Sequence, residues 1–320
     1  MSSVLDTVGR GRLGLVSSFA VPDVLTRNVL GAWGEDGARW LAALPGLRED
    51  VASAWGLRVG EPYLLSYHWV APATRADGTA VVLKLGVPGA EHLPVEAATL
   101  QCWGGAGAVR LLAYEPAWGA LLLERATPGT MARSLVPARD TEATAAIVGV
   151  MRRLHAARVP DGGLPDLESQ GEAFARHLAV FAGDDPLPRA MVERAGGLFD
   201  ELCASAPARV VLHGDLHHDN VLAAEREPWL AIDPHGVVGD PGYEAGALVH
   251  NPEPDRHDDE LLALLPARIE QLADGMGQPV ERIRAWAFVK SVLSEVWTAE
   301  DGGPVGGLAL DVAHRLWPRV

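Results

Sequence analysis

Three polar residues at fixed spacing in the C-terminal half constrain this chain more than any other feature. They lie in VLHGDLHHDNVLAAEREPWLAID, residues 211–233, which contains the pattern H-x-D-x-x-x-x-N and, thirteen residues after its asparagine, an aspartate that closes an apolar run. Phosphoryl transfer from a nucleotide uses such a set, since one carboxylate orients a hydroxyl while an amide and a second carboxylate hold magnesium. We therefore predict that Asp215 is the catalytic base and that Asn220 and Asp233 bind the metal through oxygen atoms.

The residues between these groups predict how they are brought together. Residues 220–222 and 229–232 are short apolar runs around a tight loop, a pattern typical of paired strands. Such a hairpin would bring the three polar groups to one edge. We expect His213 to pack beneath the loop and bond its backbone. Asp240 is expected to accept backbone N–H bonds below the metal or, alternatively, to form a turn.

A zinc cluster is the alternative interpretation of this segment, because imidazoles and carboxylates are common zinc ligands. Its candidate ligands are His213, Asp215, His217, His218 and Asp219. Adjacent His217 and His218 would point in different directions, and no cysteine lies nearby. We therefore favour phosphoryl transfer and assign no catalytic role to these two histidines.

The chain contains only two lysines, Lys84 and Lys290, against 25 arginines, so each lysine is notable. Lys84 lies near the end of the run TAVVLKL after an Asp-Gly turn, a pattern typical of a hairpin strand. An ammonium on a buried strand is costly unless it faces an anion. The expected anions are the phosphates of ATP and the carboxylate of Glu96, twelve residues later on a predicted helix. The alternative is an edge-strand lysine that reaches water.

The segment LHHDNVLAAEREPWLAIDP, with Lys84 and Glu96 upstream, resembles the aminoglycoside phosphotransferase family. Within that family it is most similar to the group of streptomycin 6-phosphotransferases and hydroxyurea phosphotransferases. The resemblance covers roughly residues 28–302. It implies an α+β, bilobal, protein-kinase-like fold with a small β-rich lobe and a larger, mostly helical lobe, and it implies ATP and Mg²⁺ as cofactors.

The local patterns suggest a division of the chain into four parts. Residues 1–27 form an N-terminal extension, 28–124 the nucleotide-binding lobe, 125–129 a hinge with Pro and Gly, and 130–320 the helical lobe with the catalytic loop and acceptor site. We expect a helix over 28–55 that Pro45 and Gly46 break. Strands are expected near 57–59, 67–71, 80–85, 109–114 and 120–124. Further helices are expected at 93–103, 141–158, 168–181, 189–205, 258–275, 280–301 and the C-terminal segment.

The resemblance also implies where the nucleotide binds. In kinases the adenine lies against the hinge, so main-chain groups from Glu124 to Ala126 are candidate contacts. No G-x-G-x-x-G loop precedes Lys84. Ser66, in the corresponding stretch, is a candidate to donate a hydrogen bond to a phosphate of the nucleotide. This departure leaves the choice between ATP and GTP open. A second departure, His235 where the group has an acid, leaves the number of metal ions open.

The charge of the chain bears on the identity of the acceptor. The net charge of −15 and the pI near 5.1 disfavour nucleic acid and anionic membranes as partners. They would attract a cationic substrate, although the acidity could equally serve solubility. The resemblance implies an acceptor pocket lined with acids, for which Glu295, Glu300 and Asp301 are our candidates and a solvated helix end is the alternative. His250 and Asn251 are exposed polar candidates.

Together these observations predict a cytoplasmic, ATP- and magnesium-dependent O-phosphotransferase, a monomer or dimer, with a small cationic hydroxyl acceptor. The resemblance favours streptomycin at its 6-hydroxyl, which would make the chain an antibiotic resistance enzyme. A same-fold kinase for hydroxyurea or for a metabolic amino sugar or alcohol is the alternative, and a silent binding module of this fold is a third. No run approaches eighteen apolar residues, so no membrane span is predicted. Cys102 and Cys203 are expected to be buried thiols.

Overall fold

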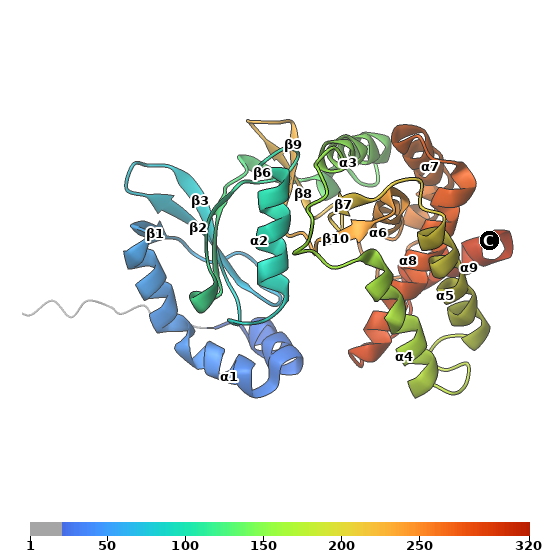
Figure 1. Ribbon diagram of the computed structural model, residues 1–320, viewed down its shortest axis with the longest axis horizontal. Coiled ribbons are helices and arrows are strands. Elements are labelled where there is room, and N and C mark those ends of the chain that lie inside the picture. Colours follow the sequence, from blue (N-terminus) through green and yellow to red (C-terminus); the bar gives the residue numbers. More distant parts are fainter. Residues whose placement is uncertain (1–20) are drawn as a thin grey trace, which may run out of the picture.

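The computed structural model of the chain describes residues 21–320 and divides them into a small lobe with a five-stranded sheet and a larger, mostly helical lobe (Figure 1). The predicted α+β, bilobal architecture is therefore confirmed. Residues 1–20 of the predicted extension lie outside the described residues. The first helix, α1 (Asp23–Ala54), begins within that extension, so the small lobe also takes in residues 23–27.

Helix α1 takes a different course from the predicted one. It continues through Pro45 and Gly46, where the sequence predicts a break, and it bends instead at Gly34, whose φ of 49° and ψ of −121° are not helical. A positive φ is readily adopted by glycine, whereas Pro45 removes one helical hydrogen bond but keeps a helical φ. The buried side chains of α1 form one core with the sheet; they are Leu25, Val29, Trp40, Leu44 and Val51.

The sheet of the small lobe is antiparallel, with the strand order β1-β2-β3-β5-β4. Its strands are β1 (Leu57–Val59), β2 (Trp69–Arg75), β3 (Ala80–Leu85), β4 (Leu111–Glu115) and β5 (Ala120–Glu124). Successive side chains of a strand point to opposite faces. In β3, Val81, Leu83 and Leu85 join the core beneath α1, while Val82 packs against the core of the other lobe. Lys84 shares the face of Val82 and therefore points away from α1.

Helix α2 (His92–Trp103) covers that second face of the sheet and lies between the sheet and the larger lobe (Figure 1). Its buried side chains Leu93, Ala97, Leu100 and Trp103 belong to the core of the larger lobe. The helix therefore places its polar residues at the boundary between the two lobes.

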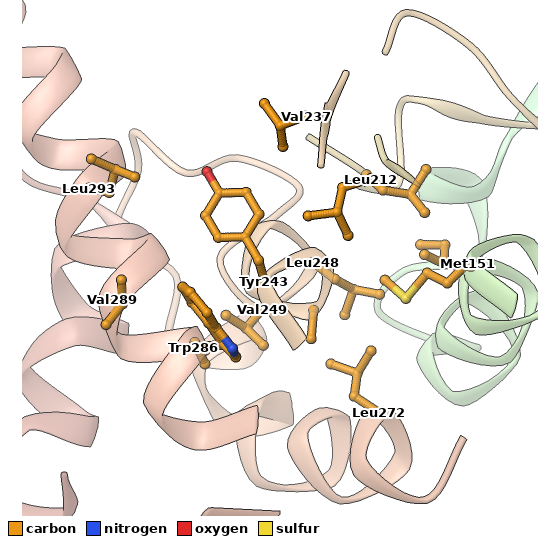
Figure 2. Close-up of a cluster of buried hydrophobic side chains, with 14 of the residues drawn as sticks. Met151, Leu212, Val237, Tyr243, Leu248, Val249, Leu272, Trp286, Val289 and Leu293 are labelled. Atoms are coloured by element: carbon orange, nitrogen blue, oxygen red, sulfur yellow. The ribbon is translucent and has the colours of Figure 1, made fainter. Parts of the chain in front are cut away.

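The larger lobe packs its helices around one buried core. These helices are α3 (Asp140–Leu154), α4 (Glu172–Val180), α5 (Arg189–Ala204), α6 (Ala245–Val249), α7 (Asp259–Met276), α8 (Val280–Glu300) and α9 (Leu308–Leu316). All of them except α6 were predicted, and where the prediction gave bounds the helix ends differ from it by at most four residues. The largest differences are four residues: α3 ends earlier than predicted, and the predicted first turn of α4 is a separate 3₁₀ turn (Leu167–Gly171). Figure 2 shows Met151 of α3, Leu248 of α6 and Trp286 of α8 in this core.

Short strands carry the catalytic segment. Strands β7 (Val210–Leu212) and β10 (Val237–Gly239) pair with each other, and β8 (Val221–Ala224) lies between β6 (Pro128–Met131) and β9 (Trp229–Ala231). The predicted hairpin around residues 225–228 is therefore present. The segment predicted as the hinge, residues 125–129, runs into β6, because Pro128 pairs with Ala224 of β8.

Two smaller expectations from composition can be compared with the structure. Cys102 and Cys203 are free and only partly buried. Burial nevertheless raises the pKa of Cys203 to about 12. Among residues 21–320, no helix combines the length and the apolar character needed to cross a membrane.

Candidate active site

Lys84 lies at the centre of the candidate active site. Its Nζ is 2.6 Å from Oε2 of Glu96 on α2 and 2.5 Å from Oδ1 of Asp233, which follows β9. Burial alone would lower the pKa of Lys84, but the charges of Asp233 and Glu96 outweigh burial and raise that pKa. The structure thus joins the lysine to the helix carboxylate that the sequence predicts, and it adds the carboxylate predicted to bind metal.

Asp233 adopts a backbone conformation that is uncommon outside glycine. Its φ is 58°, in the left-handed region, and such strain is concentrated at functional sites. Burial would raise the pKa of Asp233, but the charge of Lys84 and a hydrogen bond from His92 hold it well below the ordinary value. The side chain is 48% exposed. Asp233 is therefore an ionised carboxylate that a ligand can reach.

Three histidines without a predicted role surround this carboxylate. The rings of His68 and His92 stack with centroids 5.2 Å apart, and the ring of His235 meets that of His92 edge-on at 5.3 Å. Nε2 of His92 lies 3.7 Å from Oδ1 of Asp233. Burial lowers the pKa of His68 well below its ordinary value and lowers that of His235 to about 4. The signal for His92 was its position four residues before Glu96, on the same helical face.

The metal-ligand geometry of the described residues does not match the zinc interpretation. Ligand atoms of His92, Glu96 and Asp233 lie within 4.8 Å of one another, and no such group forms among the five residues of the zinc interpretation. The ammonium of Lys84 already contacts both carboxylates of this group. This cluster is therefore a lysine-centred ion-pair network.

Asp215 and Asn220 are fixed to each other within the catalytic loop, residues 213–220. Nδ2 of Asn220 donates to the main-chain oxygen of Asp215 at 2.9 Å. Nε2 of His217 lies 3.4 Å from Oδ2 of Asp215 and 3.2 Å from Nδ2 of Asn220. Burial would raise the pKa of Asp215, but the hydrogen bond and charge of His217 outweigh it and lower that pKa. The structure therefore brings His217, to which the sequence assigned no role, against the carboxylate of Asp215.

His213 supports this loop from below, as predicted. Its Nε2 lies 2.8 Å from the main-chain oxygen of Ile232, and its Nδ1 accepts the N–H of Asp215 at 3.3 Å. The carboxylate of Glu244 accepts the N–H groups of His213 and Gly214 at 2.6 and 3.1 Å. Glu244 is a buried residue that the sequence analysis missed. It fixes the main chain directly before Asp215.

Asp240 forms a turn instead of supporting the loop of residues 213–220. Its Oδ1 accepts the N–H of Gly242 at 2.7 Å, and its Oδ2 pairs with Arg282. These contacts begin the short 3₁₀ turn that leads into α6. The turn-forming alternative is therefore correct for Asp240, and the supporting role belongs to Glu244.

The donors at this edge of the site fit a magnesium ion, which prefers oxygen ligands. Asn220 and Asp233 would hold it. They are neighbours across the β8–β9 hairpin, because the N–H of Ile232 donates to the main-chain oxygen of Asn220 at 3.0 Å. Since Nδ2 of Asn220 is engaged by Asp215, the side-chain oxygen is the atom of this amide that remains for a cation.

The residues predicted to contact the nucleotide lie at the junction of the lobes. Arg226 in the β8–β9 turn donates to both carboxylate oxygens of Glu124, at 2.8 and 2.9 Å. The N–H of Glu124 donates to the main-chain oxygen of Arg110 at 2.9 Å. No hydrogen bond joins the main chain of Ala126 to another described residue, so its polar groups are available to a ligand. Ser66 is exposed in the loop before β2.

A cavity of about 280 Å³ opens beside the carboxylate of Asp215. The residues that matter most in its wall are Asp215, His217, Lys290, Trp297, Thr298 and Asp301. His250 and Asn251 also line it, but they are buried rather than exposed as predicted, because they bond Ser291 and the main chain of Ala247. A larger cavity of about 440 Å³ lies behind the loop, beside His155. Of these two cavities, the smaller one is lined by Asp215.

The three acids predicted for the acceptor fall in different environments. Asp301 lines the cavity. Glu300 instead pairs with Arg176 at 3.1 Å, and Glu295 is buried and accepts the N–H of Gly306 at 2.9 Å. Neither Glu295 nor Glu300 lines the cavity, so their predicted contact with an acceptor finds no support in their positions.

The fold and site define a small-molecule kinase that acts on a hydroxyl group. The chain belongs to the family described as aminoglycoside/hydroxyurea antibiotic resistance kinases, which matches residues 65–302. It is 34% identical over 297 residues to a streptomycin 6-kinase of Streptomyces glaucescens, covering 88% of this chain and 92% of that protein. It is 36% identical over 311 residues to a hydroxyurea phosphotransferase of Kitasatospora aureofaciens, covering 92% and 85%.

Solved structures show the same fold. An aminoglycoside phosphotransferase from Streptomyces rimosus, in complex with ADP and streptomycin, has a TM-score of 0.57 at 20% identity and covers 80% of this chain and 98% of its own. A choline kinase from Streptococcus pneumoniae has a TM-score of 0.59 at 14% identity, covering 87% and 98%. These likenesses support the protein-kinase-like architecture of the two lobes.

Proposed function

We propose that this chain is an ATP- and magnesium-dependent O-phosphotransferase whose acceptor is streptomycin, modified at its 6-hydroxyl. The observation that carries the chemistry is the placement of Lys84 between Glu96 and Asp233. Asp215 and Asp301 line the cavity of about 280 Å³. The choice of acceptor is supported by relatives named streptomycin 6-kinase, at 34 and 35% identity.

In this proposal Lys84 binds the α- and β-phosphates of ATP, and Glu96 holds the ammonium in place. Asp215 orients the acceptor hydroxyl and accepts its proton while the hydroxyl oxygen forms a bond to the γ-phosphorus. The bond between the γ-phosphorus and the β,γ-bridging oxygen breaks, and its electron pair leaves with ADP. The products are the phosphorylated acceptor, ADP and a proton on Asp215 that passes to solvent.

The surrounding residues position these reacting groups. Asn220 and Asp233 would hold magnesium, which would supply positive charge to neutralise the phosphates. His217 lies against the carboxylate of Asp215, and the lowered pKa keeps Asp215 ionised to receive a hydroxyl proton. Glu244 and His213 fix the main chain that carries Asp215. Main-chain groups around Ala126 contact the adenine.

The biological consequence follows from charge. A cationic aminoglycoside binds RNA through its positive groups, so a phosphate dianion placed on it weakens that attraction. Asp301 is the exposed acid at the cavity, where it faces a cationic group of the acceptor. Resistance to the antibiotic would result.

Hydroxyurea is the second candidate acceptor. The cavity of about 280 Å³ is small, and its wall contains Lys290, His217 and His250 beside the two acids, an environment that also suits a small neutral molecule. The relative named hydroxyurea phosphotransferase, at 36% identity, supports this alternative. Both acceptors use the same phosphate-side residues.

The test is ADP release with Mg-ATP across streptomycin, a deoxystreptamine aminoglycoside, hydroxyurea, and simple amino sugars and alcohols. The Asp215→Asn variant is the matched control, because it keeps the size of the side chain but loses the base. Turnover on streptomycin that vanishes in the variant, with phosphate on the 6-hydroxyl by NMR, is the expected result. Turnover confined to another acceptor would reject the streptomycin proposal and keep the kinase.

A further inference from the structure

Lys290 differs from Lys84 in the partners that surround its ammonium group. It is 2% exposed in the wall of the acceptor cavity. Its Nζ donates to the main-chain oxygen of Gly214 at 2.9 Å and to the hydroxyl of Tyr243 at 2.8 Å. Whereas Lys84 contacts two carboxylates, Lys290 forms no ion pair within the described part of the chain. Its direct partners are neutral.

This arrangement is not explained by the stability of the fold. A buried ammonium without a carboxylate partner loses hydration that a carbonyl and a phenol only partly replace. The rings of Tyr243 and Trp297, with centroids 4.5 and 4.7 Å from Nζ, add a modest attraction. A methionine would occupy the same volume on α8 without that loss. The charge at this position therefore points to a ligand.

The stem of Lys290 is held so that its ammonium has a defined place. A Cβ added to Gly246 of α6 would lie 2.4 Å from Cβ of Lys290, so α6 and α8 are in close contact here. Gly214, whose carbonyl accepts from Nζ, directly precedes Asp215. The ammonium is thus anchored to the catalytic loop and cannot swing away without releasing it.

An ammonium has three N–H donors, and two of those on Lys290 have partners among residues 21–320. The residue shares the cavity wall with Asp215. We infer that Lys290 is a further catalytic residue, whose remaining N–H donates to an oxygen of the acceptor beside the hydroxyl that Asp215 orients. The inference deepens the proposed function and rests on it.

The inference fixes the orientation of the acceptor. An ammonium repels cationic groups, so the acceptor presents a hydroxyl, ether or carbonyl oxygen to Lys290. Its guanidinium or ammonium groups face Asp301 in the same cavity. An acceptor without an oxygen close to the reacting hydroxyl would be a poor substrate.

The test compares Lys290→Met with the wild type in full steady-state kinetics and in thermal unfolding. We expect kcat/KM for the acceptor to fall by about 10- to 100-fold, since a hydrogen bond from a charged donor is lost. KM for ATP should not change. The melting temperature should change little, because the relief of burying an ammonium offsets the hydrogen bonds that Gly214 and Tyr243 lose. Arg284→Met on the same helix removes a positive charge outside the cavity and should leave all these quantities unchanged.

Two results would overturn the inference. One is a Lys290→Met enzyme with wild-type kcat/KM for the acceptor. The other is a lower melting temperature together with an equal fall in kcat/KM for ATP and for the acceptor. That combination indicates a residue with a structural role only. Failure of the proposed acceptor is read separately, from the wild type alone. In that case kcat/KM of the wild type and of Lys290→Met is compared with the acceptor that the panel identifies.

Discussion

The carboxylate of Glu244 accepts the main-chain N–H of His213 at 2.6 Å, two residues before Asp215. Burial would raise the pKa of Glu244, but hydrogen bonding and charge from His155 and His213 lower it. An ionised carboxylate beneath the loop accepts N–H bonds more strongly than a neutral group would. The negative charge of the buried Glu244 therefore helps to fix the main-chain conformation of the loop.

Replacing Glu244 by glutamine should loosen the catalytic loop. The new amide nitrogen can face a backbone N–H, so one hydrogen bond is lost within a buried site. We expect the free energy of unfolding to fall by about 1–3 kcal/mol and kcat to fall more than either KM changes. Urea unfolding and steady-state kinetics measure both. Glu172→Gln, at an exposed position of α4, is the control and should change neither. A wild-type kcat in Glu244→Gln would contradict the role.

Removing the ammonium of Lys84 should affect nucleotide binding and stability in separable ways. Lys84→Met leaves Glu96 buried and unpaired, so the free energy of unfolding should fall by about 3–5 kcal/mol. The affinity for Mg-ADP, measured by calorimetry, should also fall. In the double variant with Glu96→Gln, part of the stability should return, because the unpaired charge is gone. The affinity should not return, because the phosphates still lack their cation. If both the stability and the affinity for Mg-ADP recovered in the double variant, the proposed contact of Lys84 with the phosphates would be rejected.

Chelation of magnesium should stop turnover without unfolding the protein. The ammonium of Lys84 pairs with the carboxylate of Asp233, so a positive charge still balances Asp233 when magnesium is chelated. We expect EDTA to abolish ADP release while the melting temperature of the nucleotide-free protein stays unchanged. Excess Mg²⁺ should restore the activity. A drop in melting temperature with EDTA alone would show that a metal is part of the fold.

Stability should fall as the pH rises through neutrality, because of Glu295. Burial raises the pKa of Glu295 to about 7, although its bond from Gly306 opposes this. Since the folded pKa lies above the ordinary value, ionisation opposes folding, and stability present at low pH is lost as the pH rises from about 5 to above 7. The free energy of unfolding of Glu295→Gln, measured by urea unfolding, should therefore exceed that of the wild type by roughly 1–3 kcal/mol at pH 8. At pH 5 the two free energies should differ little. A difference that is the same at both pH values would contradict this assignment.

The sequence predicts those parts of the site that depend on local periodicity. The alternation of β3 sets the face of Lys84, and the helix that follows places Glu96 opposite it. The motif spacing likewise predicts the β8–β9 hairpin with Asn220 and Asp233 at its edge. Each of these contacts follows from strand alternation, a helix or a tight turn.

The contacts that the sequence does not predict join distant segments. Glu244 meets His213 across 31 residues, and Lys290 meets Gly214 across 76, so no local pattern encodes either pair. The predicted acids on α8 fail for a different reason. Glu295 and Glu300 are five residues apart, which places them on different sides of a helix with 3.6 residues per turn. A cluster in sequence was therefore not a cluster in space.

The placement of both lysines inside the kinase site has a practical consequence for handling this protein. Reagents that acylate side-chain amines, such as activated-ester dyes and biotin, normally find targets on a protein surface. Here both such amines are buried and hydrogen-bonded. Labelling or immobilisation through lysine should therefore be inefficient in the native state. Any lysine adduct that does form would mark a molecule whose active site had opened.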